Sequence, residues 1–424
     1  MKTSIVIRIT ISLLLLLLLS LPAAASDFTL GVFGNANEDD TINMQDVTYT
    51  ELIILEYRDQ TELSDAKYDS KINMQDVTQI ELVILGKEKE ITVLDSTDRI
   101  VTVEKPVKRI IAVNCYVVDP LRTLNAADKL VGVVDYITNA PEEYFGELCD
   151  LPCIGPYIPD YEVVLNLCPD LVILSTGSYH DAVLDTLESA DSDLPIPRLE
   201  FGYPTPDHLS EEITKLGYIV DSRGEAKEFI EWYEGIIDIV KAGTDKLSDD
   251  EKPRVLYGTF SELSTNEWYT PLGGSTQHYS VETAGGLFVA EDLELPSGEY
   301  YVDLEWVIMQ NPDVIVRYYY PGMWECYAED DVAEIIAQRE EVLNHPSLAE
   351  VNAVKNKKVQ MLSTTFSYGQ PYPLGIAYFA KTFHPELFCD LDPQAMHQEY
   401  LTEFLGIDYD LNEHGVFVYP PIED

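Results

Sequence analysis

The sequence predicts an α/β protein with two doubly wound, Rossmann-like lobes joined by one long helix, preceded by a small α-helical module. Three observations predict this arrangement. The peptide Ile-Asn-Met-Gln-Asp-Val-Thr occurs at 42–48 and again at 72–78, which indicates a duplicated helical unit. From residue 91 onward, short apolar segments alternate with helical patterns, as in a parallel sheet covered by helices. A long helical pattern over 223–247 separates two such regions.

Residues 1–25 have the composition of a secretory signal peptide. Lys2 and Arg8 flank the start of an apolar run that includes Leu13–Leu19, and Ala23-Ala24-Ala25 suits cleavage before Ser26. No cysteine stands at the cleavage site, so a lipoprotein anchor is not supported. We therefore expect an extracytoplasmic protein, in the periplasm or at the cell surface, with anchoring by an uncleaved signal as the alternative.

Residues 30–87 contain two oxygen-rich loops whose spacing is typical of calcium ligands. Calcium takes six to eight oxygen ligands, and a twelve-residue loop can supply most of them from alternate positions. Thr41 and Lys71 would contribute backbone carbonyls, and the other ligands would be side chains. The first loop offers Asn35, Asn37, Asp39, Thr41, Asn43 and Asp46, and the second offers Asp65, Asp69, Lys71, Asn73 and Asp76. We expect one or two bound Ca²⁺ ions, with a solvated acidic linker as the alternative.

These loops resemble those of the dockerin type I module, in which two loop–helix units each bind calcium and pack together. Aspartate at the twelfth loop position and isoleucine at the eighth fit that family. The resemblance implies docking onto a cohesin-type partner through Met44-Gln45 and Met74-Gln75, although the same residues would also suit plain loop surface. Lys67 departs from the pattern, because it occupies a ligand position and so predicts a weaker second site.

Composition excludes several classes of function. The formal net charge of -48 makes nucleic acid an unfavourable partner. Six cysteines in 424 residues do not form a disulfide scaffold, and no Cys/His cluster has the spacing of a zinc site. Cys149 and Cys153 are close enough in sequence to pair, and free thiols are the equal alternative. The chain is too long for one compact domain.

The first lobe is expected over 91–222. Alternation and β-branching predict a hairpin, and continuous apolar segments predict buried parallel strands. Helical patterns lie between these strands. The expected strands cover 91–95, 100–103, 106–113, 130–134 and 171–174, and the expected helices cover 120–130 and 161–167.

A second, weaker repeat predicts a homologous second lobe over 248–424. Glu162 precedes Pro169-Asp170 and an apolar strand, and Glu305 precedes Pro312-Asp313 and another apolar strand with the same spacing. Proline ends each helix and aspartate turns the chain. The helix over 223–247 would span about 30 Å or more, which predicts only slight closure of the two lobes.

From residue 91 to the C-terminus the chain resembles the solute-binding proteins of ATP-binding-cassette (ABC) importers, in the iron-complex and cobalamin family. The marks are 107–111, Glu162 with 169–173, Gly273-Gly274-Ser275 with 282–286, Glu305 with 311–315, 353–359 and 380–388. The resemblance implies that ligand binds between the lobes and that the loaded protein docks on a membrane permease. It implies that Glu162 and Glu305 meet permease arginines; helix-dipole stabilisation is the alternative reading.

Ligand contacts are expected in the loops that leave the carboxyl ends of the parallel strands. Aromatic rings there suit large flat ligands such as a ferric siderophore, a haem or a corrinoid. An arginine would pair with an anionic ligand, and a histidine would suit an axial position on haem or cobalt. The candidate residues are Tyr116, Tyr157, Tyr179, His180, His278, Arg317, Tyr318, Tyr319, Tyr320, Trp324 and Tyr368.

Two functions other than import follow from the same features. One is a cell-surface scaffold or adhesion component assembled through the dockerin-like module. The other is an extracellular metal-dependent enzyme. The sequence has no nucleophile elbow, HExxH motif or phosphate-binding loop, so we expect no enzymatic activity.

Overall fold

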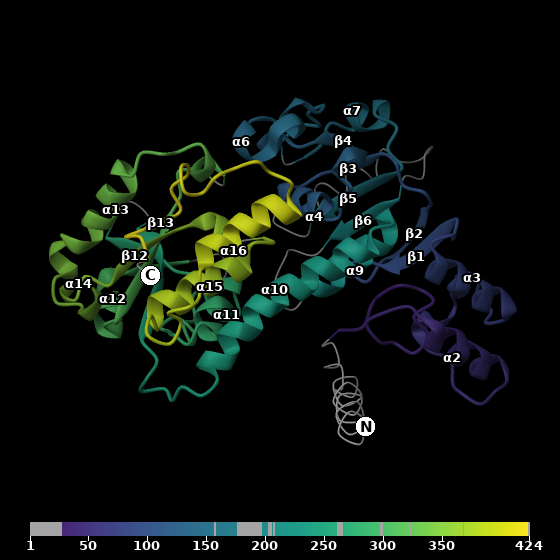
Figure 1. The fold of residues 1–424 in the computed structure, drawn as a ribbon, viewed down its shortest axis with the longest axis horizontal. Coiled ribbons are helices and arrows are strands. Elements are labelled where there is room, and N and C mark those ends of the chain that lie inside the picture. Colours follow the sequence, from purple (N-terminus) through teal and green to yellow (C-terminus); the bar gives the residue numbers. More distant parts are fainter. Residues whose placement is uncertain are drawn as a thin grey trace, which may run out of the picture. The chain divides into compact units, whose positions relative to one another are not determined.

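The computed structural model describes residues 28–156, 158–175, 197–201, 206, 208–260, 266–296, 300–322, 324–367 and 369–422. The chain divides into two compact units, one ending at Ile84 and one beginning at Leu85. Figure 1 shows the element order along the chain. In the described part of the chain, no helix is both long and apolar enough to cross a membrane.

The first unit consists of two loop–helix repeats. The helices are α2 (Met44–Ile54) and α3 (Met74–Leu85), with a 3-10 turn at Glu62–Ser64 between them. Asn43 caps α2 by accepting a hydrogen bond from the Gln45 amide, and Asp46 completes a capping box. The buried apolar side chains of this unit are Leu30, Val32, Phe33, Ala36, Ile42, Val47, Leu63, Ala66, Val77, Ile80 and Val83.

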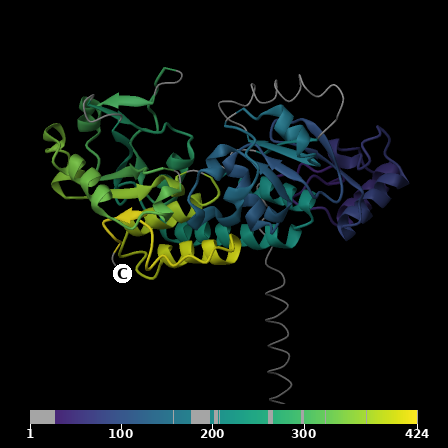
Figure 2. The same cartoon turned by 90° about the horizontal axis from the view of Figure 1, so that it is seen from above.

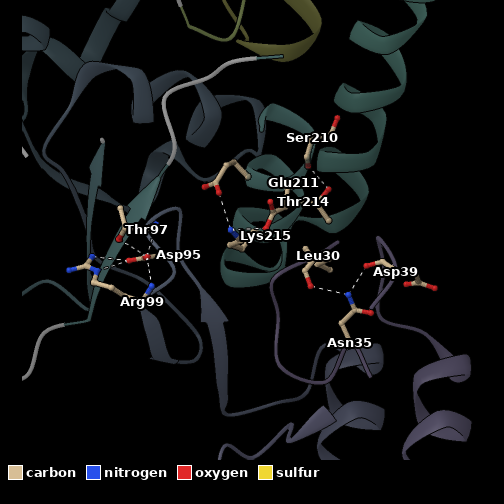
Figure 3. Close-up of polar contacts among 11 residues, drawn as sticks. Leu30, Asn35, Asp39, Asp95, Thr97, Arg99, Ser210, Glu211, Thr214 and Lys215 are labelled. Carbon is tan, nitrogen blue, oxygen red and sulfur yellow. Dashed lines mark hydrogen bonds and ion pairs between the residues drawn. The ribbon is translucent and has the colours of Figure 1, made fainter. Parts of the chain in front are cut away.

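The second unit begins with the predicted hairpin, which pairs β1 (Glu90–Leu94) with β2 (Ile100–Glu104). Asp95 holds the turn: Oδ1 accepts from the Thr97 and Arg99 amides, and Oδ2 accepts from the Arg99 guanidinium (Figure 3). Burial of Asp95 raises its pKa, but these hydrogen bonds outweigh burial and leave the pKa below its usual value. The turn is therefore anchored by an ionised carboxylate.

The first α/β region contains a four-stranded parallel sheet in the order β4-β3-β5-β6. The strands are β3 (Ile110–Ala112), β4 (Leu130–Val133), β5 (Leu171–Ser175) and β6 (Arg198–Phe201). The helices are α4 (Val118–Thr123), α5 (Asp135–Thr138), α6 (Glu142–Phe145), α7 (Tyr161–Asn166) and α9 (Leu209–Val220).

Two elements of this region are shorter than predicted. The strand expected over 106–113 is paired only at 110–112, because the amides of Lys108 and Arg109 donate to the Asp170 carboxylate. The helix expected over 120–130 ends at Thr123, where Asn125 takes a left-handed conformation with φ of 51°.

The second α/β region contains a seven-stranded sheet. Parallel strands β7 (Arg254–Phe260), β11 (Val314–Tyr319) and β12 (Val359–Ser363) form its centre. Strands β8 (Glu267–Tyr269), β9 (Leu287–Phe288), β10 (Tyr301–Asp303) and β13 (Val418–Tyr419) complete it. The helices are α11 (Thr276–Thr283), α12 (Leu304–Gln310), α13 (Ala333–Leu343), α14 (Asn352–Lys355), α15 (Tyr372–Phe383) and α16 (Pro393–Glu399).

The long helix predicted between the two sheets is α10 (Arg223–Thr244). It runs beside α9 and α15 (Figures 1 and 2). Its 22 residues span about 33 Å. One face is buried, through Ala226, Phe229, Tyr233, Ile236, Ile237, Val240 and Thr244. The six cysteines are all free, so Cys149 and Cys153 do not pair.

Candidate functional site

A pocket of about 330 Å³ lies between the two α/β regions, at the carboxyl ends of strands β4 and β11. Carboxyl ends of parallel strands are where α/β folds bind ligands, and small-molecule sites enclose roughly 300–1,000 Å³. The first region contributes Asp135, Tyr136, Asn139 and Ala140, and the second contributes Tyr320, Gly322, Trp324 and Glu325.

The aromatic residues that line this pocket differ in exposure. The Trp324 side chain is only 6% exposed, and its ring packs edge-on against Phe145 with centroids 4.8 Å apart. Tyr136 and Tyr320 are 40% and 60% exposed, so part of each residue faces solvent. Trp324 is therefore held by packing between the two α/β regions, whereas the two tyrosines lie at the exposed rim of the pocket.

Two carboxylates line the same pocket. Oδ1 of Asp135 is buried and has no hydrogen-bond partner among the described residues. Glu325 is exposed, and its Oε2 accepts from the Trp324 amide. A buried carboxylate oxygen without a partner is costly, so a hydrogen-bond donor or a cation beside Asp135 Oδ1 would be favourable.

Tyr116, one of the predicted contacts, lies where the two α/β regions meet. Asn114 Oδ1 accepts from the Tyr116 amide, and the ring approaches Gly369 so closely that a Cβ there would lie 3.2 Å from Cδ1 of Tyr116. Nearby, Gln370 donates to the Thr123 hydroxyl at 2.6 Å and links the two regions. Tyr116 does not line the 330 Å³ pocket.

Three further predicted contacts lie in the interior instead. Arg317, Tyr318 and Tyr319 belong to β11, a central strand buried along its whole length. The Arg317 guanidinium donates to the Glu341 carboxylate at 2.7 Å and to the Gln338 carbonyl. Tyr320, the first residue after the strand, lines the pocket together with Trp324. Tyr157, Tyr179, His180 and Tyr368 lie outside the described residues.

His278 lies on α11, away from this pocket, and its ring stacks on Phe288. Its ligand nitrogen and carboxylate oxygens of Glu282 and Glu291 lie within 4.8 Å of one another, a grouping that can hold a metal ion. His278 Nδ1 accepts from the Gly274 amide at 2.9 Å. In the neutral ring the proton is therefore on Nε2. A metal ion bound at Nε2 would require the tautomer with its proton on Nδ1.

Glu162 and Glu305 occupy equivalent and exposed positions. Asp160 caps α7 and Asp303 caps α12, and each glutamate stands two residues after its cap. The equivalence of the two helices extends to two arginines that the internal repeat in the sequence did not reveal. Arg109 donates to the Leu167 carbonyl and Arg254 donates to the Gln310 carbonyl, each closing the end of the glutamate-bearing helix.

The first predicted calcium loop is closed by its last aspartate. Asp46 is fully buried; Oδ1 accepts from the Asn37 amide and Oδ2 accepts from the Asn43 amide. Asn35 Nδ2 bridges the carbonyls of Leu30 and Asp39 (Figure 3). Asn35 Oδ1 is buried without a partner among the described residues. Burial raises the pKa of Asp46 to about 6.

The second loop repeats this network. Asp76 is buried and accepts from the amides of Lys67 and Asn73, and Lys71 donates its amide to Asp69 as Thr41 does to Asp39. Asp65 differs from Asn35, because it accepts from the Asp69 and Ser70 amides. Burial raises the pKa of Asp76 as well. Glu38 in the first loop and Tyr68 in the second are both left-handed, with φ of 58° and 51°.

Comparison with known proteins identifies the second unit. The profile of the family described as "Periplasmic binding protein" matches residues 110–364, more than half of the chain. The chain belongs to the periplasmic binding protein family. This periplasmic binding protein is 23% identical to the molybdate-binding protein MolA of Haemophilus influenzae over 352 residues, which cover 75% of this chain and 91% of MolA.

Three further comparisons, one of sequence and two of structure, agree with this assignment. A cobalamin-binding protein of Halobacterium salinarum is 24% identical over 228 residues, 53% of this chain and 58% of the relative. The TroA-like periplasmic binding protein FepB of Veillonella parvula superimposes with a TM-score of 0.62 at 20% identity, covering 77% of this chain and 98% of FepB. The structure of MolA bound to molybdate gives 0.59 at 20% identity, covering 75% and 99%. These superpositions show the mixed α/β fold.

Sequence reasoning missed the contribution of β4 to the pocket of this periplasmic binding protein. Asp135, Tyr136 and Asn139 follow β4 directly, as Tyr320 follows β11. The signal was present, because residues that follow a buried strand lie at the ligand-binding edge. Residues 135–138 contain a single aromatic residue, Tyr136, so a search for aromatic clusters at strand ends does not identify them.

Proposed function

We propose that this chain is the extracytoplasmic solute-binding protein of an ABC importer, with two α/β lobes that hold a metal complex between them. The observation that carries the proposal is the pocket itself. In a member of the periplasmic binding protein family, exposed aromatic rings from both α/β regions meet at the ends of parallel strands. Aromatic faces suit large, flat, unsaturated ligands.

The ligand classes we favour are ferric siderophores, haem and corrinoids. The name of the Halobacterium salinarum relative supports a corrinoid, and that of MolA supports an oxyanion instead. Tyr136, Tyr320 and Trp324 favour a ligand with an extended face over a small oxyanion.

Docking on the permease is proposed to use Glu162 and Glu305. Their equivalent positions on α7 and α12 give two exposed carboxylates, one on each lobe, which suits a two-point dock onto basic side chains. Replacing both glutamates with alanine should leave ligand affinity unchanged and reduce ABC-dependent uptake by tenfold or more, about 1.4 kcal/mol or more of docking energy.

The matched control is a double alanine substitution at Glu228 and Glu294, two exposed glutamates outside these helix starts. Uptake should stay normal in that variant. Loss of ligand affinity in the Glu162/Glu305 variant, or normal uptake by it, would contradict the assigned role.

The first unit is proposed to bind Ca²⁺ and to act as a dockerin-like attachment module. The unpartnered Asn35 Oδ1 and the two buried carboxylates of Asp46 and Asp76 are oxygens that a calcium ion would satisfy. Met44 and Met74 are 59% and 58% exposed at equivalent positions, which suits contact with a cohesin-type partner. An extracytoplasmic location, where calcium is abundant, fits weak sites of this kind.

A further inference from the structure

The pocket between β4 and β11 is acidic, and no basic side chain offsets this charge. Asp135 and Glu325 supply carboxylates, and none of the eight described lining residues is lysine, arginine or histidine. Oxyanions are bound by amide donors, helix N-termini or cationic side chains. A pocket with this lining would repel them.

The arginines nearest in sequence to the pocket are already bound elsewhere. Arg317 is buried and paired with Glu341 and the Gln338 carbonyl. Arg122 donates to the Tyr144 carbonyl at 2.8 Å and pairs with the buried Asp119. Releasing Arg122 would leave the buried Asp119 carboxylate without its partner, and Arg317 is itself a buried charge that would lose its partner Glu341. Both changes are strongly unfavourable. Neither is therefore a free counter-charge for an anionic ligand.

The sequence offers no other lysine or arginine near the strand ends that could pair with an anionic ligand. Lysine and arginine are absent from the segments that follow the parallel strands: 113–121, 134–146, 176–197, 202–208, 261–271, 289–300, 320–338 and 364–380. Asp135 Oδ1 is buried and has no hydrogen-bond partner among the described residues, so a ligand that brought a donor or a positive charge to this oxygen would be favoured. Exposed aromatic faces next to it, Tyr136 and Tyr320, also attract cations.

We propose that this pocket selects positively charged metal complexes and discriminates against oxyanions and anionic chelates. The inference rests on the proposed solute-binding function and narrows its ligand class. It separates this protein from MolA, whose structure was solved with molybdate bound. Asp135 would accept hydrogen bonds from the ligand or offset its charge, Glu325 would add to the same field, and Tyr136 and Tyr320 would lie against the ligand face.

The test is calorimetric titration of the full mature chain with calcium present. The probes are three ferric complexes of opposite or zero charge: ferrioxamine B (cationic), ferrichrome (neutral) and a ferric tricatecholate (anionic), with molybdate as the oxyanion. The expected order of affinity is cationic, then neutral, with about a hundredfold or greater loss for the anionic complex, which corresponds to about 2.7 kcal/mol. Molybdate should not bind.

Single substitutions distinguish the effect of the pocket carboxylates on ligand affinity from the effect of the net charge of the whole chain. Asp135→Asn should weaken ferrioxamine B about tenfold and leave ferrichrome within about twofold. Glu325→Gln, at an exposed position, provides a second variant that does not depend on a buried group. The control Asp150→Asn removes the same charge from an exposed site outside the pocket and should change neither affinity.

Equal or tighter binding of the anionic complex or of molybdate would overturn this inference and leave the importer function standing. Equal effects of Asp135→Asn and Asp150→Asn would also overturn it, since only the overall charge would then matter. Failure of every probe to bind would also overturn the inference, and the importer function would then rest on haem and corrinoids, the other ligand classes proposed above.

Discussion

Single buried residues carry much of the specificity of this fold. His397 is fully buried, its Nε2 lies 2.9 Å from the Tyr327 hydroxyl, and its ring packs edge-on against Phe366 and Phe417. Burial lowers the pKa of His397 to about 3, because the charged imidazolium would lose its hydration. The folded protein therefore holds this ring neutral at all ordinary pH values.

The low pKa of His397 predicts a loss of stability in acid. An unfolded histidine titrates near pH 6.5, so below that pH the unfolded state takes up a proton that the folded state refuses. The free energy of unfolding should fall by about 1.4 kcal/mol per pH unit, or about 2 kcal/mol between pH 6.5 and pH 5. Urea unfolding at pH 7 and pH 5 measures this.

His397→Gln keeps a hydrogen-bonding group beside Tyr327 and removes the titration. The decrease in unfolding free energy between pH 7 and pH 5 should be about 2 kcal/mol smaller in this variant. His208→Gln, at an exposed histidine, should behave like the parent protein. An unchanged pH dependence in His397→Gln would contradict the buried, neutral assignment.

At the scale of elements, close helix packing depends on glycine at particular positions. Gly375 lies in α15, and a Cβ there would stand 2.5 Å from the Phe366 carbonyl oxygen. Gly235 lies in α10, where a Cβ would meet no atom within 4 Å. Alanine substitutions at these two positions can therefore be compared directly. Both glycines lie in helices, but only at Gly375 would a Cβ collide with neighbouring backbone.

Gly375→Ala should destabilise the α/β unit by about 1–3 kcal/mol, because backbone must move to admit the methyl group. Gly235→Ala should stabilise it by about 0.5–1 kcal/mol, because alanine restricts the unfolded chain and suits a helix interior. Thermal unfolding of both variants tests this. Shifts of the same sign in the two variants would refute the packing described for α15.

The two loop–helix elements of the first unit predict unequal calcium sites. Asp46→Asn should remove the tighter site and Asp76→Asn the weaker one, since Lys67 stands at a ligand position of the second loop. Equilibrium dialysis of the full chain counts the bound ions. Asp59→Asn, exposed between the loops, is the control. Full calcium binding by Asp46→Asn would rule out the assigned loop.

The periodicity of apolar residues predicted the positions of helices and strands well, but it predicted less well which side chains are buried. The β1–β2 hairpin, α7, β5 and α10 lie close to their predicted positions because local patterns determine them. The aromatic cluster at 318–320 was predicted to contact ligand, but two of its three tyrosines are interior. Sequence alone does not reveal that β11 is central and covered on both faces, nor that Arg317 has Glu341 as its partner.

At the scale of the whole α/β unit, residues from both α/β regions line the 330 Å³ pocket, and several packed contacts join the two regions. Tyr144 and Phe145 pack against Trp324, and Gln370 donates to Thr123, so both regions support the pocket walls. The long helix α10 packs on both α9 and α15. This arrangement favours a pocket that is largely formed before ligand arrives, as expected for a carrier with slight closure.

Tryptophan fluorescence of the mature protein, titrated with ferric siderophores, hemin and cobalamin, tests the central claim most directly. Trp324 lines the pocket, so one member of the panel should quench the emission saturably at micromolar or lower concentration, and Trp324→Phe should remove most of that signal. Calcium-loaded, folded protein that shows no saturable response to any member, with calorimetry also silent, would contradict the solute-binding account.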